Sequence, residues 1–153
     1  MPTNSAARRG FSLIELLIVI GLIAILQFIA ISPANQARMI TNETAVLHEL
    51  KTIHTAQAQH HAQFGRFAVS LRELGPPPGV KLLPKVLAAG EKDGYKFVLQ
   101  GTADGYTLNA MPVTFNKSGR RSFYSDETMA VHHNWGAEAA TEESPEAGEK
   151  EKR

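Results

Sequence analysis

The chain has 153 residues, a formal net charge of +1 and no cysteine. The length is about that of one domain, the weak charge gives no argument for nucleic-acid binding, and disulfide bonds are excluded. Because much of the apolar content lies in one block near the start, we expect a water-soluble part of roughly 100 residues. Such a part can hold a modest core but leaves little room for an elaborate catalytic cleft.

Charge is unevenly distributed along the chain. Residues 1–10 are polar, and Arg8 and Arg9 give them two positive charges that no acid offsets. Residues 136–153 contain six glutamates and three cations, a local charge of −3. The middle of the chain is therefore only weakly basic, and we expect no nucleic-acid partner.

An apolar block runs from Phe11 to Ile31, and its only polar side chains are Ser12, Glu15 and Gln27. Twenty-one residues at 1.5 Å each span roughly 31 Å, which matches the hydrocarbon core of a bilayer. Backbone amides at that depth must bond within the segment, so the block is expected to be helical. Residues 11–33 are predicted to form a transmembrane helix.

Pro33 is expected to kink or locally melt this helix, because it has no amide hydrogen to donate to the carbonyl one turn earlier. Residues 34–65 are predicted to be the amphipathic second half of the same helix, with Gly65 as its stop. The apolar stripe predicted to face a core is Ile40, Leu47, Leu50, Ile53, Ala56 and Phe64. The polar positions predicted to lie elsewhere are Asn42, Glu43, Glu49, Lys51 and Gln59.

Residues 66–135 are predicted to form a small α+β head. Ser70 is expected to cap a helical turn that Gly75 ends, the prolines at 76–78 to form an extended linker, and residues 80–89 a short helix broken near Pro84. The apolar period then changes to two, which predicts four short antiparallel strands around 95–100, 106–110, 121–124 and 129–133. One face of this meander should cover the stripe of the helix.

Residues 136–153 have no apolar period and are predicted to be a disordered acidic tail. The predicted fold class is therefore α+β: a long N-terminal helix packed on a small antiparallel β-meander, followed by that tail.

The stretch RRGFSLIELLIVIGLIAIL resembles the class III leader and N-terminal helix of type IV pilins and type II secretion pseudopilins. The resemblance implies that a prepilin peptidase removes the leader 1–10 by cutting after Gly10 and methylates Phe11. It also implies that residues 11–33 become a filament-core helix and that Glu15, at the fifth mature position, acts in assembly. The implied partners are this peptidase, copies of the chain or other pilins, and an inner-membrane assembly platform. The implied location is the bacterial inner membrane, with a cytoplasmic leader, and then a periplasmic or cell-surface filament.

The residue types suit this chemistry. Arg8 and Arg9 fix the orientation by the positive-inside rule, and Gly10 gives a peptidase access to the backbone. A carboxylate at the centre of a membrane helix costs about 2.5–3.5 kcal/mol, and less near its end. Cleavage creates a partner for Glu15, because Phe11 then carries an α-ammonium. The resemblance implies pairing with a neighbouring subunit; a pairing within the same chain is also open.

The N-terminus has three other interpretations. A secretory signal peptide, a twin-arginine signal and a plain membrane anchor each explain part of it, but the length of the apolar block and the position of Glu15 favour the pilin-like motif. The chain departs from the usual pilin pattern at Ala24, where glycine is common, and at Ser32, because the proline follows one position later. Gly21 and Pro33 are therefore the predicted sites of bending.

Elsewhere we expect no metal and no cofactor. His54, His61 and the pair His132–His133 lack the spacing of a zinc site, and we predict solvated positions for them. Asp126 and Glu127 are weak calcium candidates, because a calcium site needs six to eight oxygens.

Other polar residues of the head give no catalytic or nucleic-acid signal. Arg120 and Arg121 lie beside Phe123 and Tyr124, and this is expected to be a solvated strand pair rather than a DNA-binding site. Ser122 and Ser125 have no nucleophile motif around them, so no enzyme is predicted.

Two classes of function remain at this point. One is a structural filament subunit, either a type IV pilin or a type II secretion pseudopilin. The other is a membrane-tethered binding module that does not polymerise. An anchored enzyme has no residue in its favour.

Overall fold

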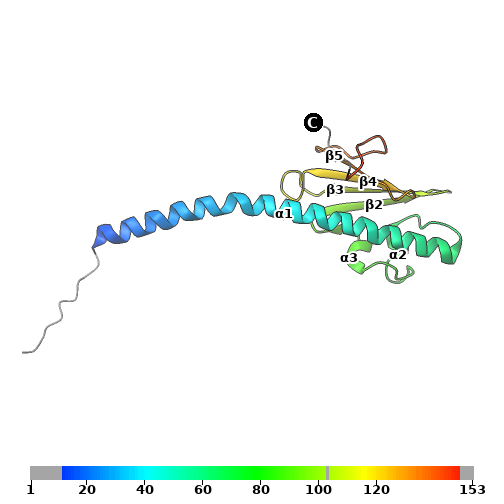
Figure 1. Cartoon of the computed structure of the whole chain (residues 1–153). Helices are drawn as coiled ribbons and strands as arrows, with labels where there is room; N and C mark the ends of the chain where they lie inside the picture. The colour runs from blue at the N-terminus through cyan, green and yellow to red at the C-terminus, as the bar shows by residue number, and fades with distance from the viewer. Residues whose placement is uncertain (1–11, 103, 149–153) are drawn as a thin grey trace, which may run out of the picture. The chain divides into compact units, whose positions relative to one another are not determined.

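The computed structural model describes residues 12–102 and 104–148, and only the backbone of residues 24–33. The chain divides into two compact units, Met1–Gln36 and Ala37–Arg153. Helix α1 (Leu13–Phe64) contributes to both, and the second unit also holds two short helices and a sheet (Figure 1). This second unit confirms the predicted α+β class.

Five antiparallel strands form the sheet in the order β1-β2-β3-β4-β5. The strands are β1 (Glu91–Lys92), β2 (Tyr95–Gly101), β3 (Tyr106–Pro112), β4 (Arg121–Asp126) and β5 (Val131–Trp135). Each strand pairs with its neighbour in sequence, which is the predicted meander. The prediction missed β1, because two residues are too few to show an alternating pattern.

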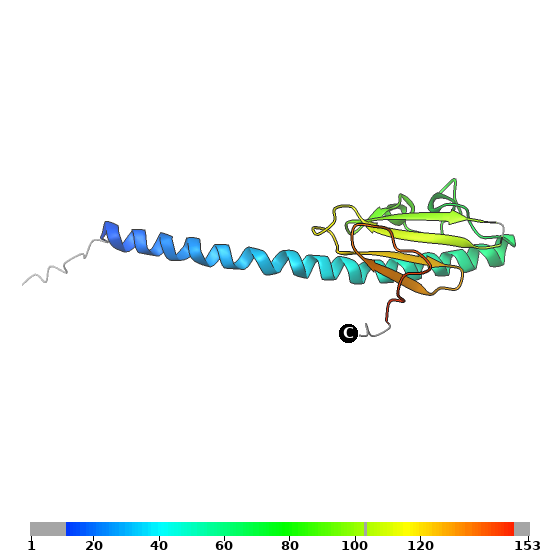
Figure 2. The ribbon, with the colours of Figure 1, turned by 90° about the horizontal axis from the view of Figure 1, so that it is seen from above.

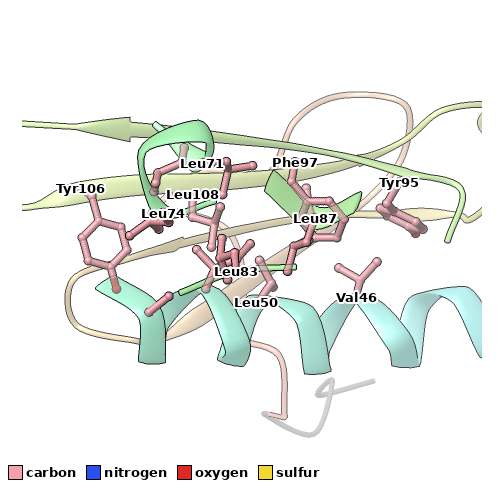
Figure 3. Close-up of a cluster of buried hydrophobic side chains, with 14 of the residues drawn as sticks. Val46, Leu50, Leu71, Leu74, Leu83, Leu87, Tyr95, Phe97, Tyr106 and Leu108 are labelled. Carbon is pink, nitrogen blue, oxygen red and sulfur yellow. The ribbon is translucent and has the colours of Figure 1, made fainter. Parts of the chain in front are cut away.

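One face of the sheet lies against α1 (Figures 2 and 3), and the labelled side chains of β2 and β3 in Figure 3 lie between the strands and the helix. Tyr95, Phe97 and Leu99 of β2 are buried and alternate with exposed residues, as predicted. Their neighbours on β3 and β4 extend the same face, since Phe97 is opposite Ala110 and Ala110 is opposite Phe123. The core they enclose with α1 also contains buried leucines from the connection between helix and sheet: Leu71, Leu74, Leu83 and Leu87.

The buried stripe of α1 differs from the predicted one. Ile40, Leu47 and Phe64 are 66%, 37% and 52% exposed, so their predicted place in the core is wrong. The stripe that is buried has residues spaced alternately by four and three: Met39, Glu43, Val46, Leu50, Ile53, Gln57 and His60. This is the spacing of one helix face, but polar residues occupy part of it. The prediction that Glu43 and Glu49 lie away from the interface is also wrong.

Five polar side chains of α1 are buried in this interface with a bonding partner. Glu49 pairs with Lys92, and we call the other four, Glu43, His54, Gln57 and His60, the polar seam. The Glu43 carboxylate accepts the Arg120 backbone N–H and the Arg121 Nε–H, both at 2.8 Å. The Gln57 amide donates to the Ala68 carbonyl at 3.0 Å and accepts the Ala68 N–H at 2.8 Å. A polar group can be buried without a large penalty only when it is bonded in this way.

The connection from helix to sheet turns sharply at each end. Gly65, with φ of 71°, ends α1 as predicted. Helix α2 (Leu71–Leu74) is the predicted helical turn, but the Ser70 side chain makes no capping hydrogen bond. The Glu73 carboxylate instead accepts the Val69 N–H at 2.9 Å and pairs with Arg66. Glu73 thus reaches back to the amide of the residue before the cap, which resembles the carboxylate half of a capping box, and the prediction overlooked this bond.

Two further predictions for this connection need correction. The prolines at 76–78 are not an extended linker, since the Gly79 N–H donates to the Pro76 carbonyl at 3.1 Å and closes a turn. The predicted helix over 80–89 is reduced to α3 (Lys85–Ala88), which begins after Pro84. Pro84 has no amide hydrogen to continue a helix from the residues before it, so the helix starts behind it.

The predicted disorder of residues 136–153 is wrong for 136–148, while 149–153 lie outside the described residues. Pro145 and Ala147 pair with the free edge of β5: the Pro145 carbonyl accepts the His133 N–H at 2.9 Å, and the Ala147 N–H donates to the Val131 carbonyl at 2.6 Å. Ala140 is buried. Composition predicted disorder because apolar side chains are few, but backbone bonds to β5 hold this segment instead.

We predict that Glu43→Ala lowers the free energy of unfolding by about 2–3 kcal/mol, because it removes the acceptor of the Arg120 amide and of the half-buried Arg121 guanidinium. The measurement is urea unfolding of the full chain in detergent, followed by fluorescence of Trp135, the single tryptophan. Glu91→Ala is the matched control, since Glu91 is exposed on β1, and it should change the value by less than about 0.5 kcal/mol. Equal effects of the two variants would contradict the role of Glu43.

Candidate processing and assembly site

The start of α1 exposes apolar side chains on all sides. Among the side chains of the first unit that the structure describes, nine large apolar ones are between 43% and 79% exposed: Leu13, Ile14, Leu16, Leu17, Ile18, Val19, Ile20, Leu22 and Ile23. Consecutive residues of a helix point in directions 100° apart, so these side chains cover its whole circumference. An exposed apolar surface of this extent marks a site of contact with a membrane or with other protein chains.

Within the described part of the chain, no helix is both long and apolar enough to cross a membrane.

Glu15 is the acidic residue in the first turn of α1. The Ser12 carbonyl closes this turn by accepting the N–H groups of Glu15 at 3.0 Å and Leu16 at 3.2 Å. The first amides of a helix carry partial positive charge, so a carboxylate in this turn is stabilised by the helix dipole. The side chain of Glu15 is exposed among apolar neighbours, where it is available to a partner.

The other predicted residues of this site lie along the same segment. Gly10 and Phe11 fall outside the described residues. Gly21 and Pro33 both lie within α1, so the helix ends at neither position. Gly21 has open space where a side chain would be. The bending predicted at Gly21 and Pro33 stays a prediction.

The chain therefore belongs to the class of proteins in which an apolar N-terminal helix, here with one acid in its first turn, is followed by a small α+β head. Comparison with protein families adds a more specific finding: the family described as the prokaryotic N-terminal methylation motif matches residues 5–26. This match supports the resemblance of the chain to the class III prepilin-like family of type IV pilins and pseudopilins. It includes the positions of Gly10, Phe11, Glu15 and Gly21 and ends before Pro33. The comparison with curated proteins found no match.

The weak calcium candidates of the head are used in other ways. Asp126 accepts the Thr128 N–H at 2.9 Å and the Thr128 hydroxyl at 2.6 Å, which closes the turn between β4 and β5. Glu127 approaches the Tyr106 N–H at 3.4 Å. Among the residues that the structure describes, no group of three or more His, Cys, Asp or Glu could hold a metal ion. The arrangement therefore gives no support to a cation site at this turn.

His54 is buried rather than solvated, so the prediction of a solvated position is wrong for this histidine. Its Nδ1 lies 2.5 Å from the Tyr106 hydroxyl and its Nε2 lies 2.9 Å from Ser125 Oγ. Ser125 uses its own proton to donate to the Ala130 carbonyl at 2.6 Å. We therefore assign the proton of the neutral imidazole to Nε2, which donates to Ser125, and Nδ1 accepts from Tyr106.

This network is structural rather than catalytic. A serine nucleophile would have to give its proton to the histidine, whereas Ser125 accepts from His54. Burial raises the pKa of the Tyr106 hydroxyl, which keeps that group protonated as a donor. Periodicity could have indicated the burial of His54, because it follows Ile53 and lies four residues after Leu50. Its two partners, however, come from strands more than fifty residues away.

Arg121 is not available to bind phosphate groups. Its Nε donates to Glu43, and its guanidinium lies over the rings of Trp135 at 4.8 Å and Phe123 at 5.3 Å. Ion pairing and ring contacts of this kind fix an arginine inside a fold. The predicted interpretation of this region as a strand pair is confirmed for β4, although Arg121 is half-buried rather than solvated.

We predict that stability falls in mild acid because of His54. Burial lowers the pKa of His54, while Asp126 acts in the opposite direction. Below about pH 6.5, His54 of the unfolded chain binds a proton that buried His54 of the folded chain does not, which favours unfolding. The contribution of His54 to the free energy of unfolding is therefore complete above that pH and is lost progressively below it. Urea unfolding of the full chain between about pH 5 and pH 8 measures this change.

The histidine variants separate this contribution from the rest. His54→Gln removes the titrating group, so its free energy of unfolding should change less with pH than that of the unaltered chain. His48→Gln, at an exposed position on the same helix, should keep the full pH dependence. An unchanged slope in the His54 variant would contradict the assignment.

Proposed function

We propose that the chain is a structural subunit of a type IV filament, processed by a prepilin peptidase and assembled through its N-terminal helix. The observation that carries this proposal is the coincidence of two features in one segment. The methylation motif covers residues 5–26, and the described part of that segment from Leu13 exposes apolar side chains on all sides. Such a helix needs an apolar environment, which the bilayer supplies before assembly and neighbouring helices supply in a filament.

Glu15 and Phe11 supply the specificity of assembly in this proposal. Cutting after Gly10 leaves Phe11 with an α-ammonium whose pKa is ordinarily about 8, so the group is largely charged at neutral pH. Within the apolar core of a filament, the Glu15 carboxylate of one subunit needs a cation, and the Phe11 ammonium of a neighbour is the group that the cut creates. Their pairing would set how far one helix is displaced along the next.

Pili and type II secretion machines use subunits with this same N-terminal chemistry, so the proposal concerns filament formation by either of them. The membrane-tethered module that does not polymerise is the competing function, and the experiments below separate it from a filament subunit. The neighbouring genes distinguish the two machines. A secretin and ATPase set indicates type II secretion, and a retraction ATPase indicates a pilus.

We predict that the chain is shortened only when a prepilin peptidase is present. Mass spectrometry of the membrane fraction should then show a chain that begins at methylated Phe11. Gly10→Ala should weaken or block the cut, because a side chain at this position obstructs access to the backbone. Full-length chain that persists beside an active peptidase would refute processing.

We predict that Glu15→Gln leaves cleavage largely intact but reduces incorporation into filaments by tenfold or more, on the order of the effect of one lost buried charge pair. Incorporation is measured as the share of mature chain recovered in sheared filaments. Gln27→Ala is the control, since it alters the other polar residue deep in the predicted helix and should incorporate normally. Normal incorporation of the Glu15 variant would remove the pairing from the proposal.

A further inference from the structure

The two edges of the head carry opposite and unpaired charges. The connection that contains α2 and α3 exposes three cations, which we call the basic edge: Arg72, Lys81 and Lys85. The segment 136–148 exposes four carboxylates and no cation, and we call these the acidic edge: Glu138, Glu142, Glu143 and Glu146. In the described part of the chain, none of these seven groups makes an ion pair. Glu73, the acid nearest the basic edge in sequence, is already paired with Arg66.

These charged groups lie at opposite ends of the sheet. Helix α3 packs beside β1, at one end of the strand order, and residues 145–147 pair with β5, at the other end. Figures 1 and 2 show the same separation from two directions, with α2 and α3 on one side of the second unit and the segment after β5 on the other. One copy of the chain therefore cannot bring its own two edges together.

The basic edge also has a recess suited to a carboxylate. A hollow of about 360 Å³ is lined by Arg72, Lys85 and the prolines 76–78, and no acidic residue lines it. The forked guanidinium of an arginine can hold a carboxylate through two hydrogen bonds, and an exposed lysine adds a second charge. The proline turn gives this recess a firm wall, because proline has few conformations to lose on binding.

The acidic edge presents its carboxylates on a tight turn. The Ser144 N–H donates to the Thr141 carbonyl at 3.0 Å, and Ser144 Oγ accepts the Thr141 N–H at the same distance. Glu142 and Glu143 lie between these two residues and are exposed. A turn closed in this way holds the two carboxylates outward, in a form that a recess on another molecule can receive.

We propose that the acidic edge of one copy of this chain docks on the basic edge of the next, with Glu142 and Glu143 against Arg72 and Lys85. The inference rests on the proposed filament role and adds a contact between heads to the contact between helices. Because the two surfaces are different and lie on opposite sides, the contact is heterologous and repeats from copy to copy. Charge complementarity selects the orientation in which the copies meet.

Crosslinking of the full chain in cells that assemble filaments tests this contact. The chain has no cysteine, so Ala89→Cys and Thr141→Cys introduced together give one defined pair for a short bismaleimide and leave the four proposed charges in place. Ala89 is exposed and lines the recess, and Thr141 is exposed beside Glu142. We expect a ladder of crosslinked multimers. Each single variant alone should give monomers, and a mixture of the two single variants should give dimers only. The matched control pairs Thr141→Cys with Lys96→Cys, an exposed lysine on the outer face of β2, and should give no ladder.

Charge reversal separates a specific contact from mere proximity. Arg72→Glu in the double-cysteine chain should lower the yield of multimers about fivefold, as should Glu143→Arg, and the two together should restore it. Lys96→Glu should leave the yield unchanged. The yield should also fall as salt is raised, since both edges are solvent-exposed.

The outcomes distinguish this inference from the filament role. Mature chain in sheared filaments without a ladder overturns the contact between heads alone. A ladder of equal yield from the control pair, or crosslinks only to a different protein, also overturns it. Absence of the chain from filaments overturns the filament role and this inference together.

Discussion

The head is held on α1 by hydrogen bonds that the helix makes inside an interface otherwise built from apolar residues. Glu43, Gln57 and His60 lie on the same face as Val46, Leu50 and Ile53, and each bonds to a group brought to it by the sheet or by the connection before it. The hydrophobic effect is non-directional, so hydrogen bonds define the position of the sheet along the helix more sharply than apolar burial does. A bonded carboxylate or amide allows one position, because displacement would leave it buried and unpaired.

This constraint reaches well beyond the helix. Glu43 fixes the start of β4 through Arg120 and Arg121, and Gln57 fixes the segment before α2 through Ala68. His54 fixes the start of β3 through Tyr106 and the end of β4 through Ser125. The seam therefore sets the position of three separate segments relative to one element. Among the side chains of the first unit that the structure describes (residues 12–23 and 34–36), Glu15 is the one acid.

Sequence reasoning succeeded where a local pattern decides the structure. Tyr95, Phe97 and Leu99 alternate with polar residues, and Gly65 ends a helix, so neighbours in sequence carry the information. It failed where distant partners decide. The burial of Glu43 and His54 depends on groups about 50 to 80 residues away, and those groups made polar residues acceptable at positions that apolar ones were expected to fill. Ile40 and Leu47 were misplaced for the same reason. Of the N-terminal site, the motif was recognised from sequence, while the predicted roles of Gly10 and Phe11 concern processing, which a folded structure does not record.

The short segment along β5 has a consequence for how copies of the chain can meet. An open sheet edge offers unpaired amides and carbonyls that another sheet can extend, and proteins held close together risk irreversible amyloid-like stacking at such edges. Here Pro145 and Ala147 form backbone hydrogen bonds with His133 and Val131 of β5. Pro145 also has no amide hydrogen that it could donate to an added strand. The opposite edge strand, β1, is only two residues long. Both edges of the sheet are thus poor templates for strand addition. Copies of the chain that are held close together can therefore associate reversibly through side-chain contacts instead.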